Sequence, residues 1–74
     1  MSKPKLNTTL LFDYEERRRA LLEDGYIQRH ETVLGDGVVC RLVHRSNGNN
    51  VTLSVSGNKL VQRTNGVVKH SHTY

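Results

Sequence analysis

The stretch VTLSVSGNKLVQRTNGVVKHSHT (residues 51–73) decides the fold, because apolar and polar residues alternate along it and only short turn sequences interrupt them. Gly57-Asn58 and Asn65-Gly66 are two-residue loops whose residues accept positive φ angles, as the tight turns of β-hairpins require. The spacing therefore predicts three consecutive antiparallel strands, at 51–56, 59–64 and 67–72.

The period of two extends upstream through two further segments, 26–34 and 38–45, which the turn residues GDG separate. Before them, LLFDYEERRRALLEDG (10–25) has the apolar spacing of a helix that starts at about residue 10 or 13 and ends at 24. Asp13 and Glu16 match a capping box, and Gly25 is typical of the residue that follows a helix.

These elements predict an α+β fold in which one N-terminal helix packs on a four- to five-stranded antiparallel β-meander. With 74 residues the chain has room for a single domain. Residues 1–9 are polar, with two lysines and one proline, and we expect them to form a flexible N-terminal arm. Residues 10–74 are then one small domain.

The two tight turns fix which residues share a face of the sheet. If residues 47–50 form a four-residue loop, Leu42 lies opposite Val55. One face then becomes apolar, and Leu21 and Leu22 of the helix should pack on it. This predicted core face contains Val38, Cys40, Leu42, Val51, Leu53, Val55, Leu60 and Val67, with His44 and Gln62 at its margins.

The orientation of the first strand stays open. A two-residue loop at Asp36-Gly37 and a three-residue loop at Gly35–Gly37 place opposite sets of its residues on the core face. The sequence is compatible with either arrangement.

The other face of the predicted sheet combines two basic rows with a thinly apolar centre. Arg45 and Arg63 lie in one basic row. Arg41 and Lys59 lie in the other. The candidate binding residues on this face are Arg41, Arg45, Lys59, Arg63, His70, Val43 and Val61.

Charge is divided unevenly along the chain, whose formal net charge is +4. All seven acidic residues lie at or before Asp36, whereas the segment from Gly37 onward has five basic residues and no acidic one. Such a division favours an anionic partner, either nucleic acid or an acidic protein surface.

We therefore expect a small non-catalytic binding module that engages nucleic acid or a nucleoprotein complex through the basic sheet face. The face has no aromatic residue on which bases would stack, and a merely solvated sheet face is a common alternative. A second hypothesis is a protein-binding inhibitor or adaptor of the kind that a mobile element or phage encodes, because Val43 and Val61 form an apolar centre with a charged rim.

Catalytic and metal chemistry find little support in the sequence. Cys40, the single cysteine, lies in an alternating run and reads as a small buried residue without a placed base. His70 and His72 share a strand face, but a structural zinc site normally needs four ligands. We expect no enzyme activity, no metal and no cofactor.

The lone cysteine excludes an internal disulfide, and no signal-peptide pattern or long apolar run is present. We expect a cytoplasmic protein with no membrane association. We also expect a homodimer, because a chain this short gains little stability from its own core. A second subunit would cover Leu10, Leu11 and Phe12, or extend the sheet along an open edge.

Overall fold

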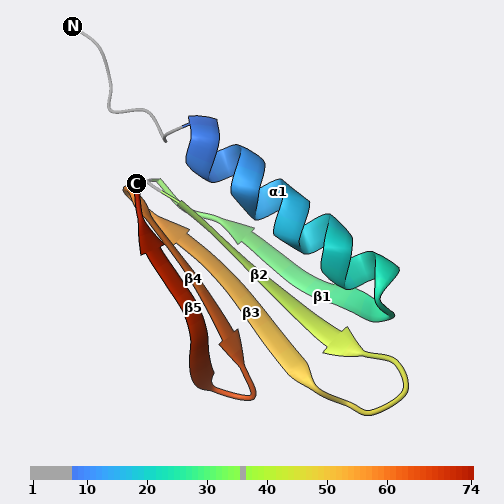
Figure 1. Ribbon diagram of the computed structural model, residues 1–74. Coiled ribbons are helices and arrows are strands. Elements are labelled where there is room, and N and C mark those ends of the chain that lie inside the picture. Colours follow the sequence, from blue (N-terminus) through green and yellow to red (C-terminus); the bar gives the residue numbers. More distant parts are fainter. Residues whose placement is uncertain (1–7, 36) are drawn as a thin grey trace, which may run out of the picture.

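The computed structural model describes residues 8–35 and 37–74 and contains one helix and one five-stranded antiparallel sheet (Figure 1). The strands follow one another in space in the order of the sequence, so the sheet is a simple meander. The predicted α+β fold is confirmed. The elements are α1 (Thr8–Glu23), β1 (Tyr26–Val33), β2 (Gly37–His44), β3 (Asn50–Ser56), β4 (Lys59–Thr64) and β5 (Val67–Thr73).

The helix starts earlier than the sequence predicts. It begins at Thr8, so Asp13 lies inside α1 and the proposed capping box is wrong. Thr8 and Thr9, which we assigned to the arm, belong to the helix, and residues 1–7 lie outside the described part of the chain. The predicted end is confirmed: α1 ends at Glu23, and Gly25 has a φ of 111°, which suits a glycine.

Both predicted tight turns are present. Gly57 has a φ of 59°, and Asn65 and Gly66 have φ values of 52° and 85°. These angles match the right-handed twist of the flanking strands, so each hairpin closes with two residues. Ser56 therefore pairs with Lys59, and Thr64 pairs with Val67.

The turn between β2 and β3 lies elsewhere than we expected. The backbone N–H of Gly48 donates to the carbonyl of His44, so the turn closes two residues earlier than the predicted loop 47–50. Leu42 consequently pairs with Val51 instead of Val55. The register error is an even number of residues, which leaves every side chain of β2 on its predicted face.

The core lies between α1 and one face of the sheet. Leu10 and Tyr14 are the buried residues of the helix, and Leu21 packs against the core. Leu22, which we expected in the core, is exposed. Cys40 is completely buried, as predicted, and burial raises the pKa of its thiol. The buried residues of the sheet are Val38, Cys40, Leu42, Val51, Leu53, Val55 and Leu60.

Polar contacts add to the small apolar contact of the helix. Arg17 donates to the side-chain oxygen of Gln62 in β4 at 3.1 Å, and Arg18 donates to that of Gln28 in β1 at 2.9 Å. Two of the three arginines in the ERRR run therefore hold the helix on the sheet.

Tyr14 makes a similar contact with the edge strand. Its hydroxyl donates to a carboxylate oxygen of Glu31 in β1 at 3.2 Å. Burial, together with the nearby Cys40 and Glu31, raises the pKa of the Tyr14 phenol, which keeps this group a hydrogen-bond donor. Because Tyr14 faces Glu31 while Arg18 faces Gln28, the helix runs antiparallel to β1.

A β-bulge settles the orientation of β1. Glu31 pairs with Cys40 and Gln28 pairs with Leu42, so one extra residue lies between them on β1. An extra residue moves the following side chains to the other face of the sheet. Even-numbered residues thus face the helix at the end of β1 that contains Gln28, and odd-numbered residues face it at the end that contains Glu31.

A second bulge lies in β5, and two predictions for this strand are wrong. The register changes between Gln62 and Arg63, so His70 pairs with Gln62 and shares the helix side of the sheet. The prediction that placed His70 on the basic face is therefore wrong. Val67 is also 57% exposed instead of buried, because it lies at the end of the outermost strand.

The residue that follows β5 is packed against the rest of the domain. Tyr74 packs against the core, and its hydroxyl donates to a carboxylate oxygen of Asp13 in α1. This hydrogen bond is the main reason why the pKa of the Tyr74 phenol is raised. The ring of His72 meets Tyr74 edge-on at 4.4 Å, so the end of β5 is linked to the helix.

Within residues 8–35 and 37–74, the structure contains no helix that is long and apolar enough to cross a bilayer.

Candidate functional site

The face of the sheet that points away from α1 is called the open face below. Its members follow from the strand register, because residues paired across antiparallel strands lie on the same side. Four rows cross the strands: Ile27, Val43 and Asn50; His30, Arg41, Thr52, Arg63 and Val68; Thr32, Val39, Ser54, Val61 and Ser71; and Gly37, Ser56, Lys59 and Thr73.

The open face brings together most of the residues that the sequence singled out. Arg41 and Arg63 both neighbour Thr52 in one row, which places their Cα atoms about 10 Å apart, two strand spacings. Lys59 lies four residues before Arg63 on β4, or about 13 Å along the strand. All three basic side chains are exposed.

Val61 and Val43 also lie on the open face, although not side by side. Val61 is half-buried at the centre of the sheet, between Ser54 and Ser71. Val43 lies near the end of β2, where it pairs with Ile27 and Asn50. Val39, instead of Val43, therefore shares the row of Val61.

Arg45 does not belong to the predicted row. Strand β2 ends at His44, and Arg45 lies in the turn that follows, where its backbone N–H donates to the carbonyl of Gly25. Because the β2–β3 turn lies earlier than predicted, Arg45 does not share a row with Arg63 as we expected. His70 lies on the helix side, as described above, so the open face keeps Arg41, Lys59, Arg63, Val43 and Val61 of the seven predicted residues.

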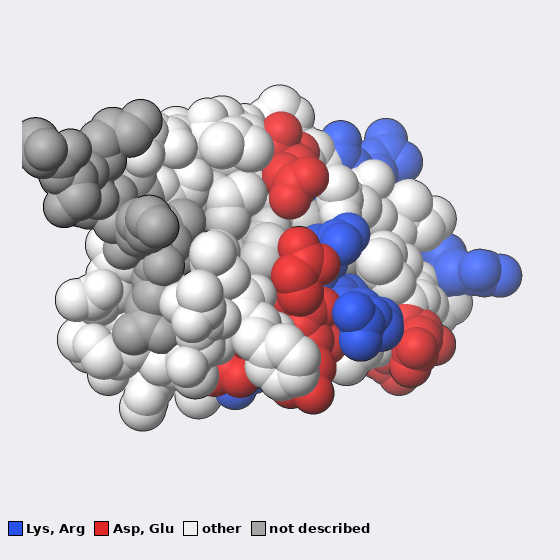
Figure 2. Space-filling view, turned by 90° about the horizontal axis from the view of Figure 1, so that it is seen from above, with Lys and Arg blue, Asp and Glu red and all other residues white. Residues whose placement is uncertain are grey.

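The two sides of the sheet differ in charge. Among the described residues, the open face carries no aspartate or glutamate. The described carboxylates belong to the helix, to the residue after it or to the helix side of β1: Asp13, Glu15, Glu16, Glu23, Asp24 and Glu31. Figure 2, which views the molecule from above the helix, shows these acidic residues intermixed with basic ones.

The basic side chains of the open face form no ion pair within the described part of the chain. The ion pair in the described part of the chain joins Arg18 to Glu15 in the helix, at 2.7 Å. Arg41, Lys59 and Arg63 have no hydrogen-bond or ion-pair partner among the described residues. Their charges therefore remain available to an external anion.

The phenylalanine and tyrosine side chains lie on the other side of the sheet. Phe12 and Tyr14 belong to the helix, and Tyr26 and Tyr74 pack against the core. Among the described residues, the open face thus offers no phenylalanine or tyrosine ring to a nucleic-acid base.

The open face contains a shallow hollow at the end of the sheet where β4 turns into β5. It is lined by Arg41, Asn50, Thr52, Asn65 and Gly66. The sequence analysis identified Arg41 as a candidate contact but interpreted Asn50 and Asn65 only as turn residues. The tight Asn65-Gly66 turn and the start of β3 come together there because β3 pairs with β4.

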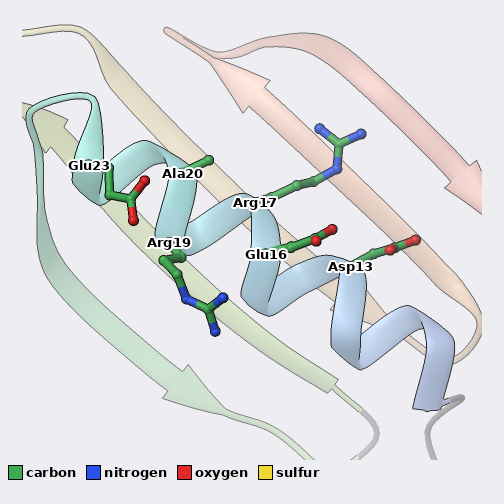
Figure 3. Close-up of a pocket in the computed structure, with 6 residues that line it drawn as sticks. All are labelled: Asp13, Glu16, Arg17, Arg19, Ala20 and Glu23. Carbon is green, nitrogen blue, oxygen red and sulfur yellow. The ribbon is translucent and has the colours of Figure 1, made fainter.

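A second hollow lies along one flank of the helix (Figure 3). Three carboxylates, two guanidinium groups and one alanine line this open surface. Figure 3 shows Arg17, Glu16 and Asp13 directed to one side of α1 and Arg19 to another, without convergence on a common point. The arrangement is a mixed-charge helix surface. Its residues are Asp13, Glu16, Arg17, Arg19, Ala20 and Glu23.

The histidines form contacts with one another and with aromatic rings. His70 and His72 stack with their ring centroids 6.5 Å apart, and His44 meets Tyr26 edge-on at 4.7 Å. Within the described residues, no three histidine, cysteine or carboxylate side chains are grouped closely enough to hold a metal ion.

The residues predicted for a dimer interface have different environments. Leu10 is fully buried against the sheet of its own chain, so it cannot also cover a partner. Leu11 is half-buried, and Phe12 is 63% exposed. Val33, the last residue of β1, and Leu34 lie at the same end of the molecule, because α1 is antiparallel to β1, and both are exposed.

Comparisons with known proteins identify no relative. No protein-family model matches the chain, and neither the curated proteins nor the solved structures contain a match.

Proposed function

We propose that this protein is a small non-catalytic binding module that engages nucleic acid, free or within a nucleoprotein complex, through its open face. The observation that carries the proposal is the segregation of charge: three unpaired basic side chains and no described carboxylate lie on one face of the sheet. Lysine and arginine side chains in such an arrangement contact phosphates.

The spacing of the charges favours contact with an extended polyanion. Arg41 and Arg63 are about 10 Å apart across the strands, and Lys59 is about 13 Å from Arg63 along β4. Thr52, Ser54 and Ser56 lie among them on β3 and supply hydroxyl donors. A single small anion would reach only part of this surface.

The absence of phenylalanine and tyrosine rings from the open face favours duplex over single-stranded nucleic acid. Proteins that bind single strands on a sheet normally stack bases on aromatic side chains. A duplex presents its phosphates without requiring stacking. We therefore expect binding that depends little on sequence, with the single strand as the weaker ligand.

The expected result is steep salt dependence of duplex binding. Three phosphate contacts give a slope of about −2.7 in a plot of log K against log salt concentration, because bound phosphates release counterions. Affinity should fall about 40-fold between about 50 mM and 200 mM salt. Fluorescence anisotropy with a labelled duplex and the matching single strand measures both. Salt-independent binding, or no duplex binding at the lower salt concentration, contradicts the proposal.

A protein-binding inhibitor or adaptor, of the kind that a mobile element or phage encodes, is the second candidate. It is favoured by apolar side chains on the same face: Val61 is half-buried at its centre, Ile27 is 46% exposed and Val68 is 50% exposed. Apolar side chains among polar and charged ones also occur at protein interfaces. A stoichiometric partner that survives nuclease treatment in a pull-down would favour this candidate over nucleic acid.

We also propose that the protein forms a homodimer through the apolar end of the molecule. Phe12 and Val33 are the two most exposed large apolar side chains there, and burying them would add to a core that a domain of this size keeps small. Sedimentation equilibrium should give about twice the chain mass of 8.4 kDa. The Phe12→Ser variant should shift it toward the monomer, and a monomeric wild type would contradict the proposal.

A further inference from the structure

The hollow on the open face is held open by a fixed asparagine side chain. Asn65 has a φ of 52°, and its Oδ1 accepts the backbone N–H of Asn50 at 2.9 Å. Its Nδ2 donates to Oδ1 of Asn49 at 3.3 Å, and its own N–H donates to the carbonyl of Asn50 at 2.7 Å. Three hydrogen bonds thus lock the β4–β5 turn to the start of β3.

This network fixes the Asn65 side chain without using up its donors. An amide nitrogen has two hydrogens, and Asn65 commits one of them to Asn49. Among the described residues, the side chains of Arg41, Asn50 and Thr52 have no intramolecular partner. The hollow therefore combines a guanidinium, a hydroxyl and two amides, with donors unused in each.

The chemistry of these donors selects an anion. No described carboxylate lies on this face, and Arg63 flanks the hollow through its pairing with Thr52. A phosphate group has several acceptor oxygens and a negative charge, so it can accept from a guanidinium, a hydroxyl and an amide at once. The Asn65 amide is held in place before binding, which lowers the entropy cost of ordering this donor.

We propose that the hollow of Arg41, Asn50, Thr52, Asn65 and Gly66 is a phosphate-binding subsite that fixes one phosphodiester of the nucleic-acid backbone. The inference rests on the proposed function and adds a defined anchoring point to it. The remainder of the open face attracts the nucleic acid by its charge, whereas this subsite positions one phosphate through hydrogen-bond donors. Binding should therefore be sensitive to changes in the hollow that leave distant positions of the same face intact.

Two matched substitutions test the subsite. Asn50→Asp places a carboxylate in the hollow, and Asn58→Asp adds the same charge at the turn between β3 and β4, at the other end of the sheet. Neither side chain has a partner in the described part of the chain, so both variants should fold. We expect Asn50→Asp to weaken duplex binding about tenfold or more, and Asn58→Asp about threefold or less.

A substitution without a charge change supplies the second measurement. Thr52→Val keeps the shape of the side chain and removes its hydroxyl, and it should weaken duplex binding about threefold with an unchanged salt slope. In NMR titrations with inorganic phosphate, the side-chain amide signals of Asn50 and Asn65 should shift at lower phosphate concentrations than that of Asn58.

The possible outcomes separate the subsite from the proposed function. Equal weakening by the two aspartate variants, or phosphate shifts spread evenly over the face, would overturn the subsite while leaving nucleic-acid binding in place. A wild-type protein that binds no duplex would instead overturn the proposed function, and the subsite with it. Weakening confined to Asn50→Asp and Thr52→Val supports both.

Discussion

Gly37→Ala is expected to remove most of the stability of the fold. A methyl group on Gly37 would lie 1.8 Å from the carbonyl oxygen of Val55 and 2.8 Å from its carbonyl carbon. Both atoms belong to the backbone of β3, so no side-chain rotation relieves the clash. We expect a loss of about 3 kcal/mol or more, at or above the upper end of ordinary overpacking. For a domain of this size, that loss lowers the Tm by about 12 °C or more.

A neighbouring glycine supplies the control. Gly35 belongs to the same hairpin, has no atom within 4 Å of the position of an added methyl group and does not adopt a left-handed φ. Gly35→Ala should be neutral or stabilise the protein by up to about 1 kcal/mol, because it restricts the unfolded chain. Urea denaturation followed by circular dichroism measures both variants. Similar midpoints for the two alanine variants would contradict the close approach of β2 and β3.

Gly37 illustrates what the sequence could not show. In the sequence, GDG at residues 35–37 reads as a turn, so both glycines have the same local explanation. The structure distinguishes them, because Gly37 is the first residue of β2 and pairs with Ser56. The need for glycine arises from a strand that follows about 20 residues later, and local sequence patterns contain no information about that contact.

The faces of the central strands could be predicted from parity, which is the even or odd position of a residue along its strand. Two tight turns and a period of two were sufficient to assign the faces of β2, β3 and most of β4, because opposed residues share a face whatever the length of the sheet. Even the misplaced β2–β3 turn did no harm to the core assignment, since Leu42 exchanged Val55 for Val51 and both are buried.

The open orientation of β1 and the wrong face for His70 share a cause: β-bulges change parity, and neither bulge has a recognisable local pattern here. One bulge in β1 allowed both of the orientations that the sequence left open. The other, in β5, moved His70 from the open face to the helix side. A bulge is selected by the fit of the strand against its neighbours and the helix, so it becomes visible only in the assembled fold.

The helix start failed for a related reason. Asp13 and Glu16 have the spacing of a capping box, but α1 continues upstream to Thr8. The carboxylate of Asp13 instead accepts the hydroxyl of Tyr74, the last residue of the chain. A contact over 61 positions therefore explains an acidic residue that the sequence assigns to a local motif.

Reversal of charge on the open face is expected to have the largest effect on function. Arg41→Glu and Arg63→Glu should each weaken duplex binding about tenfold or more, because each removes a charge-assisted contact and adds repulsion. If the two effects are additive, the double variant binds about 100-fold more weakly. The slope of log K against log salt should become shallower by about one unit for each arginine that contacts a phosphate.

Arg19→Glu separates contact from net charge, since it makes the same change in charge on the exposed surface of α1, on the other side of the sheet. A protein that attracts nucleic acid only through its overall charge of +4 would lose equal affinity in all three single variants. A protein that docks through the open face loses affinity at Arg41 and Arg63 and changes less than about threefold at Arg19, because exposed charges more than about 10 Å from the ligand are largely screened. The substituted side chains are exposed and have no described ion-pair partner, so thermal unfolding should change little. Equal losses in the three single variants would therefore refute the open face as the binding surface, even if the protein binds nucleic acid.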